Sequence, residues 1–209
     1  MGETASFPTL PPDEAPALVP PWPDDYWRQV PAWSMAGNDR FGDCVFAACA
    51  NHIDLVKAVN GDPQVVSEAE AERFYAVEAG FNPMEPVTDQ GAAIEDALDY
   101  WHENGWPADP TYKCGPRMKI DRKDVPAAIK RYGAVYGFVM LPNMDDDLLW
   151  TDAVLGSPPR DGHAVLIVGA QNGFQIVSWG EKVDVSRNWW TVFGRDCWAV
   201  MLPDWKEPG

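Results

Sequence analysis

The chain has 209 residues, 46% of them apolar and 23% charged, which is typical of one well-packed globular domain. Its formal net charge of −16 disfavours direct binding to nucleic-acid phosphates or to anionic lipid, so we expect neither as a partner. Four scattered cysteines are too few for a disulfide scaffold, and no stretch has the length and apolarity of a membrane span.

Proline recurs throughout the first 33 residues. Because proline fixes φ and lacks an N–H, this stretch is not expected to form a helix or a central strand. We predict that residues 1–26 form an extended arm that lies on its own domain or on a protein partner. The first residues have no basic start and no apolar run, so no secretory signal is predicted. The expected location is the cytoplasm, or a virion if the chain is phage-encoded.

The first half of the remaining chain shows helical periodicity. Apolar residues recur at helical spacing from Cys44 to Val59, and Asn60-Gly61 ends the run. A second helix is predicted from Ser67, because Glu70 completes a capping box there. Apolar faces indicate two further helices, around residues 94–101 and 125–132.

After these helices the pattern changes to short apolar or alternating runs, which predict strands at residues 134–141, 163–170, 174–179 and 197–202. Asn172-Gly173 predicts a hairpin turn between the second and third of them. Helices followed by antiparallel strands indicate an α+β fold. Residues 142–162 are too long for a plain connection, and we expect Asp145–Asp147 to form a solvated acidic loop rather than a calcium site.

Cys44 is the first candidate for chemistry. It opens a predicted helix directly after Gly42-Asp43. Unpaired N–H groups and the positive end of the helix dipole favour a thiolate at such a position. The alternative is a small buried residue with no role beyond packing at the start of a helix.

His163 and Asn38 are the next candidates. His163 stands at the mouth of a strongly apolar run, where it either faces a cleft or packs in the core against a backbone carbonyl. Asn38 lies six residues before Cys44, so its amide and the Cys44 backbone N–H could together hold an oxyanion. An asparagine in Gly-Asn-Asp is also an ordinary turn residue.

A metal site is not expected. Cys49 and His52 lie three residues apart on one predicted helix, but no Cys-x-x-Cys pair accompanies them. We therefore predict that both pack in the core, and that the protein needs neither a metal nor another cofactor.

Several segments, in the same order along the chain, resemble papain-like cysteine peptidases. Trp27-Arg28-Gln29 and the stretch from Asn38 to Cys44 are similar to the opening of the mature enzymes. The stretch from Asp89 to Gly105 resembles the family's Gly-Gly segment and the helix after it, and Pro126 to Leu141 resembles the next helix and strand. Gly162 to Gly169 and Phe174 to Gly180 resemble the histidine strand and the Ser-Trp-Gly strand.

This resemblance implies a papain-like domain over residues 27–209. Its helical half, at about residues 27–125, would carry the central cysteine-bearing helix, packed on an antiparallel β half at about residues 126–209. It also implies that Cys44 is the nucleophile and His163 the base, and Asn38 stands where the family has its oxyanion-hole glutamine. By the same resemblance, the residues expected to contact a peptide or protein substrate are Gln90, Gly91, Gly162 and Trp179.

The position expected to orient the histidine departs from the family pattern. Val177 stands where the family has the asparagine that orients the histidine. Ser178 could replace it, Asp161 or Asp184 could reach the ring, or no residue orients it. Two functions therefore stay open: a thiol hydrolase of peptide or isopeptide amides, and a weak or inactive papain-like domain with a binding or structural role in a bacterial or phage assembly. Other cysteine amidases, such as cell-wall peptidases, match the pattern less well.

Overall fold

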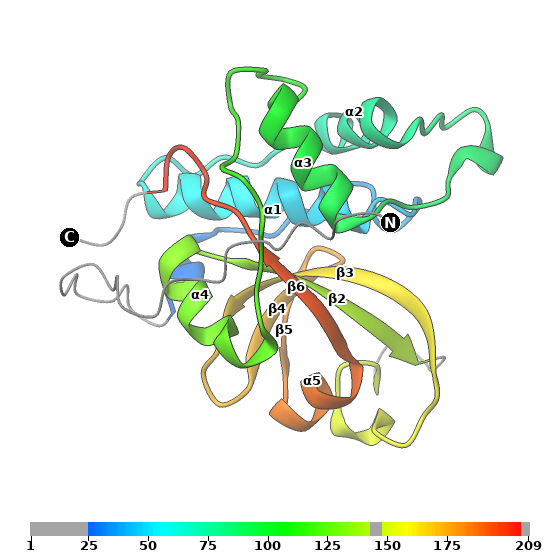
Figure 1. Cartoon of the computed structure of the whole chain (residues 1–209), viewed down its shortest axis with the longest axis vertical. Coiled ribbons are helices and arrows are strands. Elements are labelled where there is room, and N and C mark those ends of the chain that lie inside the picture. Colours follow the sequence, from blue (N-terminus) through cyan, green and yellow to red (C-terminus); the bar gives the residue numbers. More distant parts are fainter. Residues whose placement is uncertain (1–24, 143–147, 206–209) are drawn as a thin grey trace, which may run out of the picture.

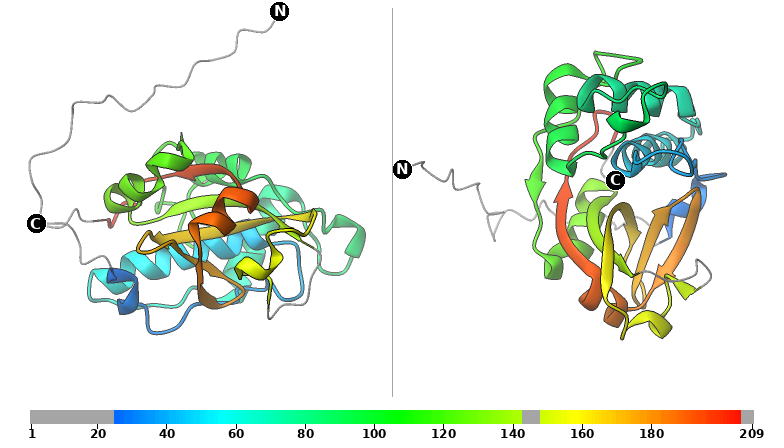
Figure 2. Two further views of the ribbon diagram at one scale, coloured as in Figure 1. Left: turned by 90° about the horizontal axis from the view of Figure 1, so that it is seen from below. Right: turned by 90° about the vertical axis from the view of Figure 1, so that its right-hand side faces the viewer.

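The computed structural model describes residues 25–142 and 148–205 (Figure 1). The predicted proline-rich arm, apart from its last two residues, and the acidic stretch Asp145–Asp147 lie outside the described residues. The described chain forms two layers, with three helices packed over one sheet, and Figure 2 shows these layers from the side.

The helical layer contains α1 (Cys44–Val59), α2 (Glu68–Ala79) and α3 (Ile94–Asn104). α1 is buried along most of its length because it lies between the sheet and the other two helices (Figure 2). The predicted start and end of α1 are confirmed, and so is the capping box of Ser67 and Glu70 at α2. Short 3-10 helices occur at Tyr26–Gln29, Pro86–Thr88, Arg122–Asp124 and Asp152–Val154.

The sheet is antiparallel, with six strands in the order β1-β6-β2-β3-β4-β5. Its strands are β1 (Met118–Lys119), β2 (Val135–Pro142), β3 (Pro159–Gly169), β4 (Phe174–Ser178), β5 (Glu181–Val185) and β6 (Gly194–Ala199). Two more helices flank it, α4 (Val125–Tyr132) and α5 (Arg187–Phe193). β3 begins four residues before the predicted strand, so His163 lies within the strand rather than at its mouth.

The β3–β4 hairpin has the predicted turn. Asn172 and Gly173 both have positive φ, of 53° and 136°, and lie in the connection of residues 170–173 between β3 and β4. The turn sets the pairing of β3 with β4 and therefore which side chains of the two strands are neighbours.

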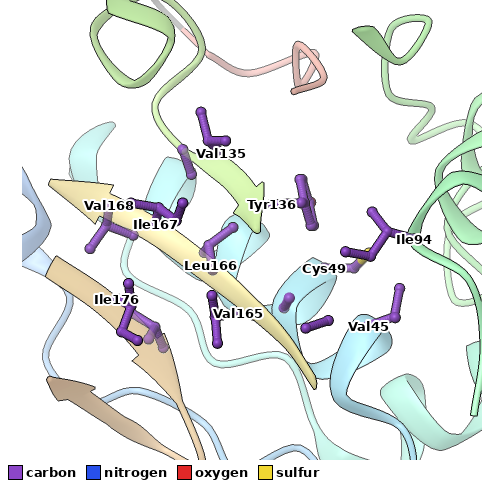
Figure 3. Close-up of a cluster of buried hydrophobic side chains, with 14 of the residues drawn as sticks. Val45, Cys49, Ile94, Val135, Tyr136, Val165, Leu166, Ile167, Val168 and Ile176 are labelled. Carbon is purple, nitrogen blue, oxygen red and sulfur yellow. The ribbon is translucent and has the colours of Figure 1, made fainter. Parts of the chain in front are cut away.

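The core fills the space between α1 and the sheet. Figure 3 shows Val45 and Cys49 of α1 close to Ile94 of α3 and to the strand residues Tyr136 and Leu166. The apolar run of β3 from Ala164 to Val168 is buried on both faces, since helices cover the sheet on both sides. This double burial explains why the run is continuously apolar rather than alternating.

Three of the four cysteines lie in this core, and Cys44 packs against it. All four cysteines are free thiols, and Cys49 and His52 are buried on α1, where His52 Nδ1 lies 3.0 Å from Tyr136 Oη. Residues 25–142 and 148–205 contain no group of three or more side chains that could hold a metal ion. No helix in this part of the chain combines the length and apolarity that a bilayer crossing requires.

Candidate active site

A cleft of about 1040 Å³ lies where the N-terminal ends of α1 and α3 meet the sheet. One wall is formed by the chain around Cys44 and by residues 89–95, and the other by parts of β2, β3 and β6. The cleft brings together every residue predicted for the site except Ser178, namely Asn38, Cys44, Gln90, Gly91, Gly162, His163 and Trp179. Residues far apart in the sequence thus share one concave surface, as expected of a ligand site.

Cys44 is the first residue of α1 and is half-buried. Its Sγ accepts a hydrogen bond from the backbone N–H of Ala164 on β3, with a donor–acceptor distance of 3.4 Å. Because Ala164 directly follows His163, this contact places the sulfur against the strand that carries the histidine. Two segments 120 residues apart in sequence are joined here.

His163 is held from the side of β4. Its Nε2 lies 2.7 Å from Ser178 Oγ, and its ring stacks on Trp179, with centroids 4.5 Å apart and planes 25° apart. Trp150 approaches both rings, at 6.4 Å from His163 and 5.6 Å from Trp179. The imidazole is therefore fixed both by a hydrogen bond and by aromatic packing.

Among the residues considered as partners of His163, Ser178 is the one that contacts it. Asp161 is exposed and forms an ion pair with Arg160, and Asp184 binds Lys182 and Gln175. Val177 is buried, and neighbouring residues of a strand point to opposite faces. The Ser178 hydroxyl, next to the valine, is thus the polar group that contacts the imidazole.

Trp179 has a strained backbone. Its φ is 47°, a left-handed value that is rare for a bulky residue. Gly180 follows with φ 72°. Stacking on His163 and a tilted contact with Trp150 hold the indole in place, so the packing around the histidine maintains this conformation.

Burial keeps both members of the pair neutral. It raises the pKa of the Cys44 thiol above its usual value, against the Ala164 N–H that favours the thiolate, and the neighbouring Asp43 raises it further. Burial also lowers the pKa of His163 to about 4. This direction is opposite to the expected stabilisation of a thiolate, because desolvation outweighs the backbone N–H groups of Ala164, Val45 and Cys44 that favour the charged form.

Asp43 is a feature that the sequence did not predict. It is fully buried at the N-cap of α1, and neither carboxyl oxygen has a hydrogen-bond partner among the described residues. Burial raises its pKa to about 8, and the charges of Glu72, Asp89 and Asp39 add to this shift. A neutral carboxyl group therefore stands next to Cys44 at neutral pH.

Asp89, Gln90 and Gly91 line the cleft on the same wall as Cys44. Gly91 has φ 72°, and Gln90 Nε2 donates to the Val87 carbonyl at 2.7 Å. Asp89 Oδ1 accepts from the Gly42 N–H at 2.9 Å and from the Tyr75 hydroxyl at 2.8 Å. The sequence analysis gave Tyr75 no role and named Asp89 only as the first residue of the segment that resembles the family's Gly-Gly segment.

Comparison with known proteins gives a result for the fold only. No family model matches the sequence, and no curated protein matches it. A solved structure from work on the limited antibody cross-reactivity of the mite allergens Blo t 1 and Der p 1 is similar, with a TM-score of 0.56. The match covers 93% of this chain and 75% of the mite chain at 17% identity. The fold is thus α+β and papain-like, as the sequence predicted.

Proposed function

We propose that this protein is a papain-like thiol hydrolase that cleaves a peptide or isopeptide amide, with Cys44 as nucleophile and His163 as general base. The observation that supports the proposal most directly is the hydrogen bond from the Ala164 N–H to Cys44 Sγ, because Ala164 directly follows His163 and all three residues line one cleft. A nucleophile next to an oriented base is the arrangement that acyl transfer requires.

The neutral resting pair determines how the reaction begins. As Cys44 Sγ attacks the substrate carbonyl, its proton passes to His163, and the C–S bond forms while the carbonyl π bond breaks. The imidazolium then returns the proton to the leaving amine, and the C–N bond breaks to give a thioester. Water, deprotonated by His163, hydrolyses the thioester and regenerates the thiol.

Ser178 would set the tautomer of His163. With Nε2 protonated and donating to Ser178 Oγ, Nδ1 carries the lone pair that accepts the thiol proton. Trp179 shields this hydrogen bond by stacking on the ring. In this proposal Ser178 orients the histidine, because Val177, which stands where the family has its orienting asparagine, has no polar side-chain atom.

Asn38 and the Cys44 backbone N–H are the proposed oxyanion donors. Asn38 lines the cleft beside Cys44, and the first N–H groups of α1 have no acceptor within the helix. Gln90, Gly91, Gly162 and Trp179 line the same cleft, and in this proposal they bind the substrate on either side of the scissile bond.

The test is turnover by the purified protein. A mixture of unfolded proteins and of peptides with Lys–Gly isopeptide bonds is incubated with the chain, and new termini are identified by mass spectrometry. We expect cleavage that falls by about 10³-fold or more in Cys44→Ala and in His163→Ala. His102→Ala is the matched control, because His102 is exposed on α3 and contacts the Cys114 carbonyl outside the cleft.

Absence of cleavage under all conditions, in a chain that is folded, would contradict the hydrolase proposal. The binding or structural role predicted as the alternative would then be tested by whether Cys44→Ala keeps full biological activity. The cytoplasmic or virion location and the protein partner of the arm remain predictions from the sequence.

A further inference from the structure

The two backbone segments that flank Cys44 in the cleft approach one another at Gly42 and Gly91. A Cβ on Gly42 would lie 2.9 Å from Asp89 Oδ1 and 3.4 Å from the Gly91 nitrogen. Gly91 has φ 72°, a left-handed backbone conformation that would be strained in a residue with a side chain. The spacing between the segment before Cys44 and the segment at Gln90-Gly91 is therefore set by a close glycine–glycine approach.

Two side chains join these segments to α2. Asp89 Oδ1 accepts from the Gly42 N–H (2.9 Å) and from the Tyr75 hydroxyl (2.8 Å). The Tyr75 oxygen in turn accepts from the Gly91 N–H (2.8 Å). One carboxylate oxygen and one phenol thus connect the segment before α1, helix α2 and the segment at Gln90-Gly91.

Tyr75 is well suited to be the fixed point of this network. Its ring stacks on Phe81, with centroids 4.4 Å apart, and on Phe46 of α1, with centroids 5.0 Å apart. Burial and the hydrogen bond to Asp89 raise the pKa of Tyr75 to about 12, so the hydroxyl remains a donor at physiological pH. The position of the Tyr75 ring is therefore set by its packing on Phe46 and Phe81 rather than by the residues that line the cleft.

We propose that Asp89 and Tyr75 are positioning residues that hold the segment at Gln90-Gly91 at a fixed distance from Cys44. The inference rests on the proposed function, in which this segment binds the substrate backbone. Gly42 lies two residues before Cys44, and Gly91 directly follows Gln90. Loss of the network would let this segment move relative to the thiol, weakening substrate binding more than it changes the thiol itself.

The test compares Tyr75→Phe with Tyr132→Phe. Both remove one hydroxyl and keep the ring, but the Tyr132 hydroxyl contacts Met118 Sδ outside the cleft. For a peptide substrate we expect Tyr75→Phe to raise KM about five- to tenfold, with kcat and the rate of Cys44 alkylation by iodoacetamide within about twofold of wild type. Tyr132→Phe should leave all three unchanged.

Variants of Asp89 make the test specific. Asp89→Asn keeps an oxygen acceptor, so its KM should stay close to that of the wild type. Asp89→Leu removes the acceptor and should raise KM at least as much as Tyr75→Phe. The double variant Asp89→Leu/Tyr75→Phe should have about the same KM as Asp89→Leu alone, because both residues act through one network. Additive effects of the two variants on KM, or a KM unchanged in Tyr75→Phe, would overturn the inference.

Amide hydrogen exchange separates failure of this inference from failure of the proposed function. In Tyr75→Phe, exchange should accelerate by about tenfold both at Gly91 and at Gly42, the two amides that the network joins. If the wild type hydrolyses nothing, the proposed function fails, while accelerated exchange at both amides would still support the positioning role. Acceleration at Gly91 alone would refute that role whatever the activity.

Discussion

His163 Nε2 lies 2.7 Å from Ser178 Oγ, in a contact between the adjacent strands β3 and β4. The contact is buried, and the stacked indole of Trp179 covers the ring of His163. It supplies a polar partner for the imidazole at a point where the neighbouring Val177 has none.

Removing the Ser178 hydroxyl should impair catalysis without unfolding the protein. In Ser178→Ala we expect kcat/KM to fall by about 10- to 100-fold, because His163 loses the acceptor that holds its tautomer and orientation. Ser178→Thr keeps the hydroxyl and should retain more activity than Ser178→Ala. Steady-state kinetics together with thermal denaturation would check this, and equal activity of wild type and Ser178→Ala would contradict the orienting role.

The strained backbone at Trp179 predicts an unusual order of stabilities. Both Trp179→Ala and Trp179→Gly lose the stacking on His163, but only glycine adopts φ 47° without strain. We therefore expect Trp179→Gly to be more stable than Trp179→Ala by about 1 kcal/mol. Urea denaturation of both variants measures this difference, and a more stable alanine variant would show that the backbone relaxes when the indole is removed.

The buried carboxyl of Asp43 predicts a pH-dependent stability. Below about pH 4 the group is protonated in both the folded and the unfolded state and has no effect. As the pH rises from about 4 to about 8, the unfolded chain ionises at Asp43 while the folded chain keeps its proton, so the free energy of unfolding falls. The loss levels off above pH 8.

Asp43→Asn removes this ionisation and keeps the side-chain shape. Its stability relative to the wild type should increase between pH 4 and pH 8, by about 1.4 kcal/mol for each unit of pKa shift relieved. Exposed Asp62→Asn is the matched control and should show no such trend. Parallel pH profiles of unfolding for wild type and Asp43→Asn would mean that Asp43 is not perturbed.

The lowered pKa of His163 predicts activity that extends into acid. In the proposed mechanism His163 must be neutral to accept the thiol proton, and burial lowers its pKa to about 4. We expect kcat/KM to stay near its neutral value down to about pH 5 and to fall below about pH 4. A pH–rate profile checks this, with circular dichroism at each pH to exclude acid unfolding. An acid limb near pH 6.5 would show that His163 is not desolvated in the free enzyme.

Much of the fold could be predicted from the sequence, because the signals are local. The caps at Ser67 and Asn60 and the Asn172-Gly173 turn fix helix ends and a hairpin through short-range hydrogen bonds and backbone preferences. β5 and α5 were not predicted. β5 is partly exposed and polar, and α5 has only seven residues, so neither has a long periodic pattern.

The sequence by itself determined the α+β order of elements and the candidate residues that the cleft brings together, since each lies in a recognisable local segment. Only the tertiary structure decided that Ser178, rather than Asp161 or Asp184, contacts His163, because strand register determines which side chains meet. It also decided that Cys44 and His163 are neutral at rest. Burial is a property of the whole packed structure, and here its effect on the thiol is stronger than that of the helix end that the sequence shows.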